Sequence, residues 1–260
     1  MQVWHMSGAG NDFMVLDVRG VTMDLSQTAK SLCALTGADG LMAVDVSDCA
    51  DFRLHFYNSD GSRGEMCGNG SRCLCRFAYD NGIAGEEMTV KTDAGLIYGW
   101  HLAENRYRVK LNNPSILEEN RLPDVAYVEL GSPGIPHGVA RIPNLCWEEK
   151  SQYWDKAVAL RHHKAFPKGI NVNFYDWIGD SSVRVLTYER FVEDYTLACG
   201  TGCASIAATL FSQGKLPQKK LTCHNQGGIL EVALEETDGT ITDLYLEGPV
   251  EVLKIYQLDI

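Results

Sequence analysis

Cys67-Gly68-Asn69-Gly70, in the first half of the chain, recurs in the second half as Cys199-Gly200-Thr201-Gly202. Each motif leads into a stretch with the apolar spacing of a helix, which the sequence predicts over 71–79 and over 203–211. The second of these stretches is apolar nearly all round, which is typical of a buried helix. The repeated motif, followed each time by a helix, is the first indication of an internal duplication.

The surroundings of the two motifs also correspond. Gly95 and Gly227 each follow their cysteine by 28 residues, and each lies between two runs typical of strands. Upstream, Tyr57 precedes the first cysteine by ten residues and Tyr188 precedes the second by eleven. We therefore interpret the chain as two similar halves, with the join near the loop residues 112–114.

Short runs of alternating apolar residues dominate the chain, in the period-2 pattern of half-buried strands, as in Phe52-Leu54-Phe56, Tyr107-Val109-Leu111, Val183-Val185 and Leu230-Val232-Leu234. The predicted fold class is α+β, in which each half is a curved, mostly antiparallel sheet wrapped around one central helix. The active site is predicted in the cleft between the halves. The N-terminal half is expected to span 1–114, joined by a C-terminal strand at 251–260, and the C-terminal half 115–250.

Two further helices are predicted outside the repeated motifs. One spans 26–35, with Ser26 as its N-cap and Gly37 as its C-terminal stop. The other runs from about 149 to 163.

Composition excludes several classes of protein. Lys and Arg total 23 against 34 for Asp and Glu, so the net charge of −11 disfavours nucleic acid and anionic membranes as partners. The sequence predicts neither a membrane-spanning segment nor a secretory signal. Nine cysteines are too few for a disulfide scaffold and odd in number, which favours reduced thiols and a cytoplasmic location.

A cysteine at the first turn of a helix has a chemical use. The unpaired N–H groups and the partial positive charge at a helix N-terminus can lower the pKa of a thiol and can also bind a carboxylate. Two such helix ends facing one cleft would place a sulfur on either side of the α-carbon of a small acid. One thiolate could then remove the α-proton while the opposing thiol protonates the other face, which inverts the stereocentre.

The other cysteines are interpreted as packing residues: Cys33, Cys49, Cys146 and Cys223 as small buried residues, and Cys73, Cys75 and Cys203 within the helices. A zinc site is disfavoured because no C-x-x-C pair occurs. A thiol hydrolase would need a histidine partner, for which His55, His137 and His224 are available, but it would leave the second motif without a task.

The chain resembles the diaminopimelate epimerase family over nearly its whole length. The resemblance rests on an ordered set of motifs: the segment from His5 to Phe13, Tyr57-Asn58-Ser59-Asp60-Gly61-Ser62, Met66 to Cys73, Tyr188-Glu189-Arg190, and Ala198 to Gly202. It implies a cofactor-independent epimerase that interconverts LL- and meso-2,6-diaminoheptanedioate in lysine biosynthesis. The partners implied are a small amino-acid substrate and a possible second copy of the chain, with no metal and no cofactor.

The resemblance also implies a role for each matching residue. Cys67 and Cys199 would be the two acid–base thiols. The groups that bind the reacting carboxylate would be Gly68, Asn69, Gly200 and Thr201. The remaining amino and carboxylate groups of the substrate would be held by Asn11, Asn58, Asn171, Glu189 and Arg190.

Four positions depart from the family pattern. Ile135 stands where an asparagine is common, Phe191 where a glycine is common, Tyr195 adds bulk, and Gly40 replaces a glutamine found in some members. These departures concern the far end of the substrate and not the reaction type. Two alternatives therefore stay open: racemisation of another amino acid, for example histidine, and a non-catalytic amino-acid binder on the same scaffold.

Overall fold

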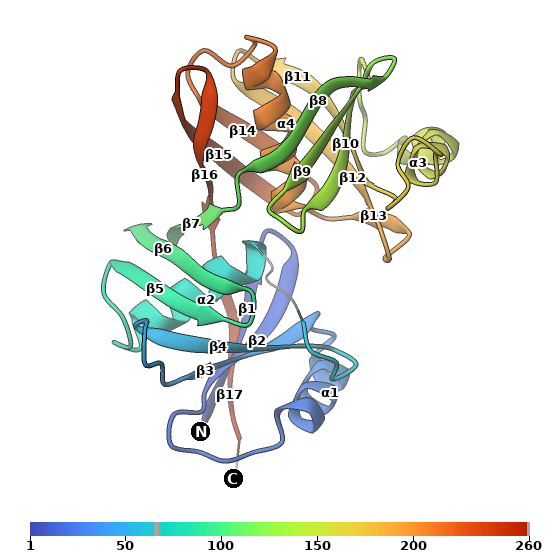
Figure 1. The fold of residues 1–260 in the computed structure, drawn as a ribbon. Coiled ribbons are helices and arrows are strands. Elements are labelled where there is room, and N and C mark those ends of the chain that lie inside the picture. The colour runs from blue at the N-terminus through green and yellow to red at the C-terminus, as the bar shows by residue number, and fades with distance from the viewer. Residues whose placement is uncertain (65–67, 259–260) are drawn as a thin grey trace. The chain divides into compact units, whose positions relative to one another are not determined.

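The computed structural model describes residues 1–64 and 68–258, and its chain divides into two compact units (Figure 1). Unit 1 comprises Met1–Lys110 and Glu247–Ile260, and unit 2 comprises Leu111–Leu246. The division therefore falls next to the loop at 112–114 that the sequence marked as a join. Each unit combines a sheet with helices, so the α+β class is confirmed.

Unit 1 contains a mixed sheet and two helices. Its elements are β1 (Gln2–Gly8), β2 (Asn11–Asp17), α1 (Leu25–Thr36), β3 (Gly40–Asp45), β4 (Phe52–Asn58), α2 (Gly68–Asp80), β5 (Glu87–Thr92), β6 (Gly95–Ala103), β7 (Arg106–Leu111) and β17 (Glu251–Gln257). The pairings give the order β17-β1-β2-β3-β4-β5-β6-β7, in which only β2–β3 and β4–β5 are parallel.

Unit 2 is built in the same way. Its elements are β8 (Pro114–Leu122), β9 (Val125–Leu130), β10 (Ile135–Arg141), η1 (Lys150–Tyr153), α3 (Trp154–Arg161), β11 (Asn171–Gly179), β12 (Ser182–Glu189), β13 (Asp194–Thr196), α4 (Gly200–Ser212), β14 (Lys220–Asn225), β15 (Gly228–Thr237) and β16 (Thr240–Pro249). Here the parallel pairs are β10–β11 and β12–β14, and β8–β9, β9–β10, β11–β12, β12–β13 and β14–β15 are antiparallel.

The two units repeat one topology, which agrees with an internal duplication. The run β9, β10, α3, β11, β12, α4, β14, β15 matches β1, β2, α1, β3, β4, α2, β5, β6 in order and in the sense of every pairing. Tyr57 pairs with the second residue of β3 and Tyr188 with the second residue of β11, so these two tyrosines are equivalent.

One detail of the predicted repeat is wrong by a residue. Gly95 closes the β5–β6 hairpin opposite Thr92, at φ 127°, and the residue that closes β14–β15 opposite Asn225 is Gly228, at φ 143°. Gly228, and not Gly227, is therefore the counterpart of Gly95. Both turns need glycine because the backbone φ is positive there. The prediction was one residue off because Gly227 and Gly228 are adjacent and either could be the counterpart of Gly95.

Helix boundaries differ from the prediction at two places. The N-cap of α1 is Asp24, whose carboxylate accepts the N–H of Gln27 at 3.0 Å, whereas Ser26 donates its hydroxyl to the carbonyl of Gly61. Gly37 is the C-cap in the left-handed region, as expected. The helix predicted over about 149–163 is a 3₁₀ turn followed by the short helix α3.

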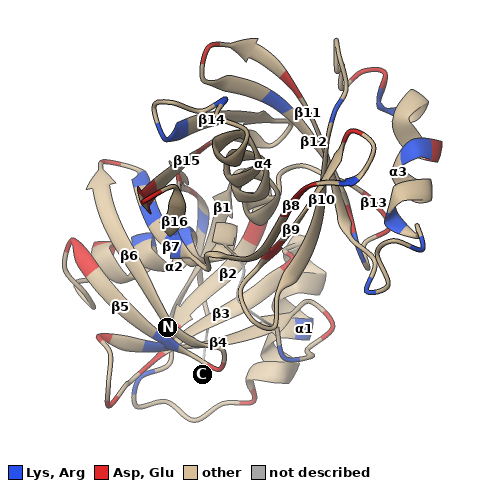
Figure 2. Cartoon of the chain, turned by 45° about the horizontal axis from the view of Figure 1, so that its top comes forward, with Lys and Arg blue, Asp and Glu red and all other residues tan. Residues whose placement is uncertain are grey.

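The central helix of each unit is buried against its own sheet. In α4 every residue from Cys203 to Leu210 is buried, and the helix carries no charged side chain (Figure 2). Helix α2 is buried from Gly68 to Cys75 and again at Phe77 and Ala78. Burial fixes both helices, and with them the backbone N–H groups of their first turns.

Candidate active site

Cys199 is the N-cap of α4 and has an extended backbone, with φ −126° and ψ 109°. Its carbonyl accepts the N–H of Cys203 at 3.0 Å, and its Sγ lies 3.5 Å from the hydroxyl of Thr201. The predicted site residues Gly200 and Thr201 are therefore the first two residues of the helix. Their N–H groups belong to the unpaired first turn, where a carboxylate can bind.

Burial raises the pKa of Cys199 well above its usual value. The negative charge of Glu189 acts in the same direction, and the opposing effects of the Thr201 hydroxyl and the Gly202 N–H are smaller. A helix end can lower the pKa of a thiol, but at Cys199 desolvation outweighs this effect. Cys199 is a protonated thiol at neutral pH and is suited to donate a proton.

Glu189 ends β12, and its carboxylate accepts the hydroxyl of Thr196 at 3.0 Å. Its charge acts on the Cys199 sulfur, so these two predicted residues lie near each other in unit 2. The next residue, Arg190, donates its backbone N–H to the side-chain oxygen of Asn171 at 2.8 Å. Unit 2 therefore brings Asn171, Glu189, Arg190 and Cys199 to the neighbouring ends of β11, β12 and α4.

A network of buried hydrogen bonds centred on Asn173 lies next to these site residues of unit 2. The amide nitrogen of Asn173 donates to the carbonyl of Gly138 at 3.0 Å and lies 3.1 Å from Nδ1 of His137, while its oxygen accepts the hydroxyl of Thr187 at 3.1 Å. That nitrogen can only donate, so a hydrogen bond to His137 requires Nδ1 to accept, with the proton of the neutral ring on Nε2. Asn173 is two residues from Asn171 on the same face of β11.

His137 gives a prediction for stability against pH. Burial, aided by the charge of Arg190, lowers its pKa from 6.5 to about 3. Between these pH values the unfolded chain takes up a proton that the folded chain does not, so the free energy of unfolding should fall as pH drops below about 6.5. The slope from this one group reaches about 1.4 kcal/mol per pH unit. Urea unfolding of the wild type and of His137→Gln from pH 7.5 to 5 measures the difference in slope.

A direct check accompanies that measurement. The ring protons of His137, followed by NMR, should keep the shifts of a neutral imidazole throughout this range. Titration of His137 near pH 6.5, or equal slopes for the two proteins, would contradict the prediction.

In unit 1, two predicted site residues meet at the first turn of α2. The amide nitrogen of Asn69 donates to the side-chain oxygen of Asn11 at 2.6 Å, and the amide oxygen of Asn69 accepts from the guanidinium of Arg72 at 3.1 Å. Asn11 in turn donates to Asp39 at 3.2 Å. The chain of hydrogen bonds from Asp39 through the two asparagines to Arg72 thus fixes the orientation of the Asn11 and Asn69 amides.

Asn58, at the end of β4, is not bonded to this group in the part of the chain that the structure describes. Its amide donates to the hydroxyl of Ser62 at 2.9 Å and its backbone N–H to the carbonyl of the same residue. Gly68 is the first residue of α2. Cys67, the predicted first thiol, lies outside the described residues.

Glycine is required where the two helices approach their sheets. A Cβ on Gly202 would lie 2.2 Å from the amide oxygen of Asn173, and one on Gly70 would lie 2.0 Å from the terminal methyl of Met42. A Cβ on Gly8, in β1, would lie 2.7 Å from the carbonyl of Asn69. These approaches explain why both motifs end in glycine.

The packing role expected for the other cysteines is confirmed for Cys33, Cys73, Cys75, Cys203 and Cys223, which are buried. It is wrong for Cys49, which is exposed, and for Cys146, which is half-buried and bonds the carboxylate of Glu148 at 3.0 Å. Both lie in irregular segments between strands, where isolated cysteines carry no burial pattern. No disulfide joins two cysteines within residues 1–64 and 68–258.

Sequence reasoning missed several residues that support the site, namely Asp39, Lys168, Asn173, Thr187 and Thr196. Asn173 could have been found from its spacing of two from Asn171 within a strand. The others become visible only when distant segments meet. Among residues 1–64 and 68–258, no cluster suited to hold a metal ion occurs, and no helix has the length and apolar character needed to cross a membrane.

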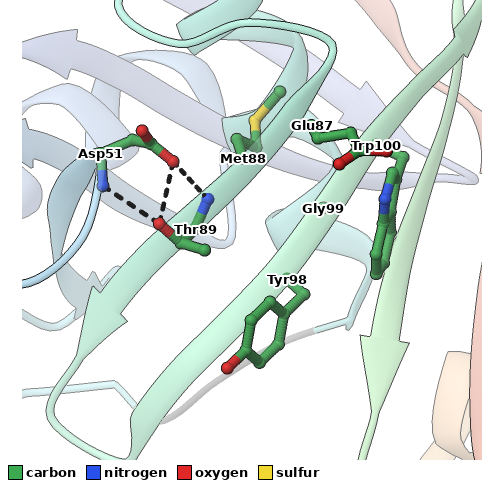
Figure 3. Close-up of a pocket in the computed structure, with 7 residues that line it drawn as sticks. All are labelled: Asp51, Glu87, Met88, Thr89, Tyr98, Gly99 and Trp100. Carbon is green, nitrogen blue, oxygen red and sulfur yellow. Dashed lines mark hydrogen bonds between the residues drawn. The ribbon is translucent and has the colours of Figure 1, made fainter.

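One cavity of about 290 Å³ lies on unit 1, away from these residues (Figure 3). Its lining is Asp51, Glu87, Met88, Thr89, Tyr98, Gly99 and Trp100. The carboxylate of Asp51 is already bonded to the N–H and hydroxyl of Thr89, at 2.7 and 2.8 Å. None of the predicted site residues lines it.

Comparison with known proteins decides the family. The model of the diaminopimelate epimerase family matches residues 3–116 and 131–253. The chain belongs to the diaminopimelate epimerase family. It is therefore a member of an isomerase family, and it is 36% identical to a diaminopimelate epimerase of Aquifex aeolicus over 96% of this chain and 95% of that protein. It is also 32% identical to one of Chlorobaculum tepidum, covering 95% and 97% respectively.

Solved structures show the same fold at lower identity. A phenazine biosynthesis protein of the PhzF family from Bacillus anthracis matches with a TM-score of 0.76 at 14% identity, covering 100% of this chain and 99% of that one. A probable proline racemase of Agrobacterium radiobacter matches with a TM-score of 0.64 at 16% identity, covering 100% and 93%. These likenesses support the two-unit α+β fold.

Proposed function

We propose that the protein interconverts LL- and meso-2,6-diaminoheptanedioate with two cysteines and without pyridoxal phosphate. The observation that carries the proposal is the buried, N-capping thiol of Cys199 in a chain of this family, next to Glu189 and the first turn of α4. In the proposed reaction one of the two sulfurs, of Cys67 or Cys199, takes the α-proton as a thiolate. The other, as a thiol, gives a proton to the opposite face of the same carbon.

The protonation state of Cys199 fits one half of this scheme. A two-base epimerase needs one thiol and one thiolate at any moment, and the raised pKa of Cys199 makes it the thiol before reaction. Removal of the α-proton places extra negative charge on the carboxylate of the substrate. The N–H groups of Gly200 and Thr201, with Gly68 and Asn69 in the other unit, would bind that charge more tightly than the substrate, which lowers the barrier.

The remaining substrate groups are assigned by charge. Glu189 is an acceptor for the amino group, and Arg190 can hold a carboxylate with two parallel bonds. Asn171 already fixes the backbone of Arg190, and the amides of Asn11 and Asn58 can serve either kind of group. We also propose that the protein acts in the cytoplasm in lysine biosynthesis, as a possible homodimer. The cysteine count and the family support action in the cytoplasm in lysine biosynthesis. The family alone supports the homodimer.

Incubation in deuterated water with a panel of amino acids tests the function. Deuterium should enter the α-position of diaminoheptanedioate, with interconversion of its LL and meso forms, and should not enter histidine or other monocarboxylic amino acids. Labelling of a monocarboxylic amino acid alone would replace the substrate assignment. Tight binding of an amino acid without any α-exchange would show a binding protein and overturn catalysis.

A further inference from the structure

We propose that Phe191 is a positioning residue that holds the guanidinium of Arg190 for the substrate carboxylate farther from the reacting carbon. The inference deepens the proposed function and rests on it. It adds to the proposed site the residue that follows Arg190 in the chain.

The guanidinium of Arg190 lies between two supports. Its central carbon is 4.5 Å from the centroid of the Phe191 ring, and one of its terminal nitrogens donates to the carbonyl of Lys168 at 3.0 Å. A guanidinium that stacks by its face keeps its N–H groups in the plane of its edge, where a carboxylate is bound. The ring therefore orients Arg190 without competing for the same contacts.

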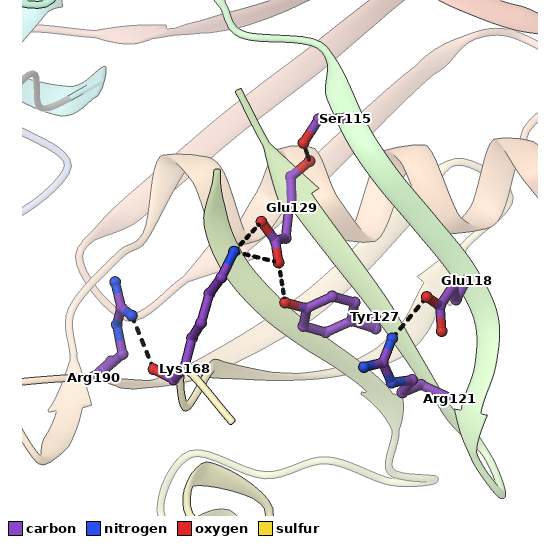
Figure 4. A network of polar contacts seen from close by, with 7 residues as sticks. All are labelled: Ser115, Glu118, Arg121, Tyr127, Glu129, Lys168 and Arg190. Atoms are coloured by element: carbon purple, nitrogen blue, oxygen red, sulfur yellow. Dashed lines mark hydrogen bonds and ion pairs between the residues drawn. The ribbon is translucent and has the colours of Figure 1, made fainter. Parts of the chain in front are cut away.

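The second support is itself anchored (Figure 4). The ammonium of Lys168 contacts both carboxylate oxygens of Glu129, at 2.9 and 3.1 Å. Glu129 is buried and also accepts the hydroxyl of Tyr127, and the Lys168 ammonium, the Tyr127 hydroxyl and the charge of Arg121 together keep the pKa of Glu129 below its usual value despite burial. The carbonyl that orients Arg190 thus belongs to a residue whose exposed ammonium is paired with the buried carboxylate of Glu129.

The turn that carries Phe191 is held in an unusual conformation. Phe191 has φ 74°, which is strained for a bulky residue, and its N–H donates to the carboxylate of Glu193 at 3.0 Å. Glu193 is paired with Arg161 at 2.7 Å, and a Cβ on Gly169, next to Lys168, would meet the same guanidinium at 2.0 Å. Arg161 therefore ties together the segments that carry Phe191 and Lys168.

Neither the strain nor the exposure of Phe191 serves folding. The ring is 80% exposed, so it contributes little to the core, and a glycine would adopt the same backbone without strain. A strained side chain that is kept next to a substrate-binding group is the pattern expected of a functional residue. A glycine would lack the contact of the ring with Arg190, at 4.5 Å, and its longer contact with Arg161, at 6.0 Å.

Two variants with a matched control test the proposal. Phe191→Leu keeps an apolar side chain but removes the aromatic face, and Phe191→Tyr keeps the face. Val192→Ala alters the neighbouring residue, which is also exposed. The first readout is the Nε–H resonance of Arg190 in labelled protein, assigned by its loss in Arg190→Lys. Ring currents should shift it in the wild type and in Phe191→Tyr, and the shift should vanish in Phe191→Leu.

The second readout is the kinetics of LL-diaminoheptanedioate epimerisation. Phe191→Leu should raise KM about two- to fivefold, the range of an exposed cation–π contact, with kcat unchanged, while Phe191→Tyr and Val192→Ala stay at the wild-type value. An unshifted Arg190 resonance in the wild type, or an unchanged KM in Phe191→Leu, would overturn the role of Phe191. A wild-type protein without activity on this substrate would instead overturn the proposed function, and the resonance would still report the stack.

Discussion

Replacing Cys199 by alanine is expected to lower kcat/KM for diaminoheptanedioate by about 10²- to 10⁴-fold, because a positioned acid or base contributes that much to a proton transfer. Cys199→Ser should be similarly impaired, although its hydroxyl can keep the contact with Thr201 that the sulfur makes at 3.5 Å. A serine hydroxyl is a much weaker acid than a thiol. Both variants remove the donor whose raised pKa makes it the thiol of the pair.

The loss should be specific in kind as well as in size. With Cys67 intact, one face of the α-carbon can still be deprotonated, so Cys199→Ala should exchange the α-proton of only one stereoisomer with deuterated water and should retain configuration. Cys49→Ala is the matched control, since that exposed cysteine lies outside the site, and it should remain within about twofold of the wild type. Inversion by Cys199→Ala at a rate near that of the wild type would contradict the two-thiol scheme.

Replacing Gly202 by alanine is expected to cost about 1–3 kcal/mol of stability, the usual penalty for overpacking a buried site. The new Cβ would lie 2.2 Å from the amide oxygen of Asn173, which is buried and bonded to Thr187. Either α4 must shift or Asn173 must turn away from His137 and Gly138. Because α4 carries the Cys199 cap, the same change should also lower kcat.

Chemical unfolding and steady-state kinetics measure the two effects. Gly179→Ala is the matched control, because a Cβ there meets nothing closer than 3.5 Å and should leave both quantities nearly unchanged. Combining Gly202→Ala with Asn173→Ala should give a smaller total loss than the sum of the single losses, since one atom causes the collision. If the stability losses of the two variants are strictly additive, or if Gly202→Ala is as stable as the wild type, the collision between the new Cβ and Asn173 does not occur and the prediction is wrong.

The sequence predicted the fold through its repeated features. Alternating apolar runs located most strands, and the paired motifs located the central helices, since both patterns are local and periodic. The N-cap of α1 was misplaced, because two nearby residues compete for the capping position. Asp24 and Ser26 are both good caps, and only the contact of Ser26 with the distant Gly61 shows which one is free to cap α1.

For the site, the sequence identified residue types better than their electrostatic state. Asn69 and Asn11 were both predicted, and the structure joins them directly. The pKa of Cys199 could not be predicted from the sequence, because a motif reveals a helix end but not the depth at which it is buried or the charge of Glu189 beside it. Supports such as Lys168 and Thr196 have no motif of their own and depend on tertiary contacts.

In the proposed reaction the sulfurs of Cys67 and Cys199 act on opposite faces of one carbon atom. Mild oxidation of the substrate-free protein, followed by peptide mass spectrometry, tests it most directly, since two sulfurs that share one small ligand can join when the ligand is absent. We expect a Cys67–Cys199 disulfide that forms in proportion to lost activity, is prevented by bound substrate and is reversed by a thiol reductant. Oxidation that leaves both cysteines unlinked, or a linked protein that keeps full activity, would contradict it.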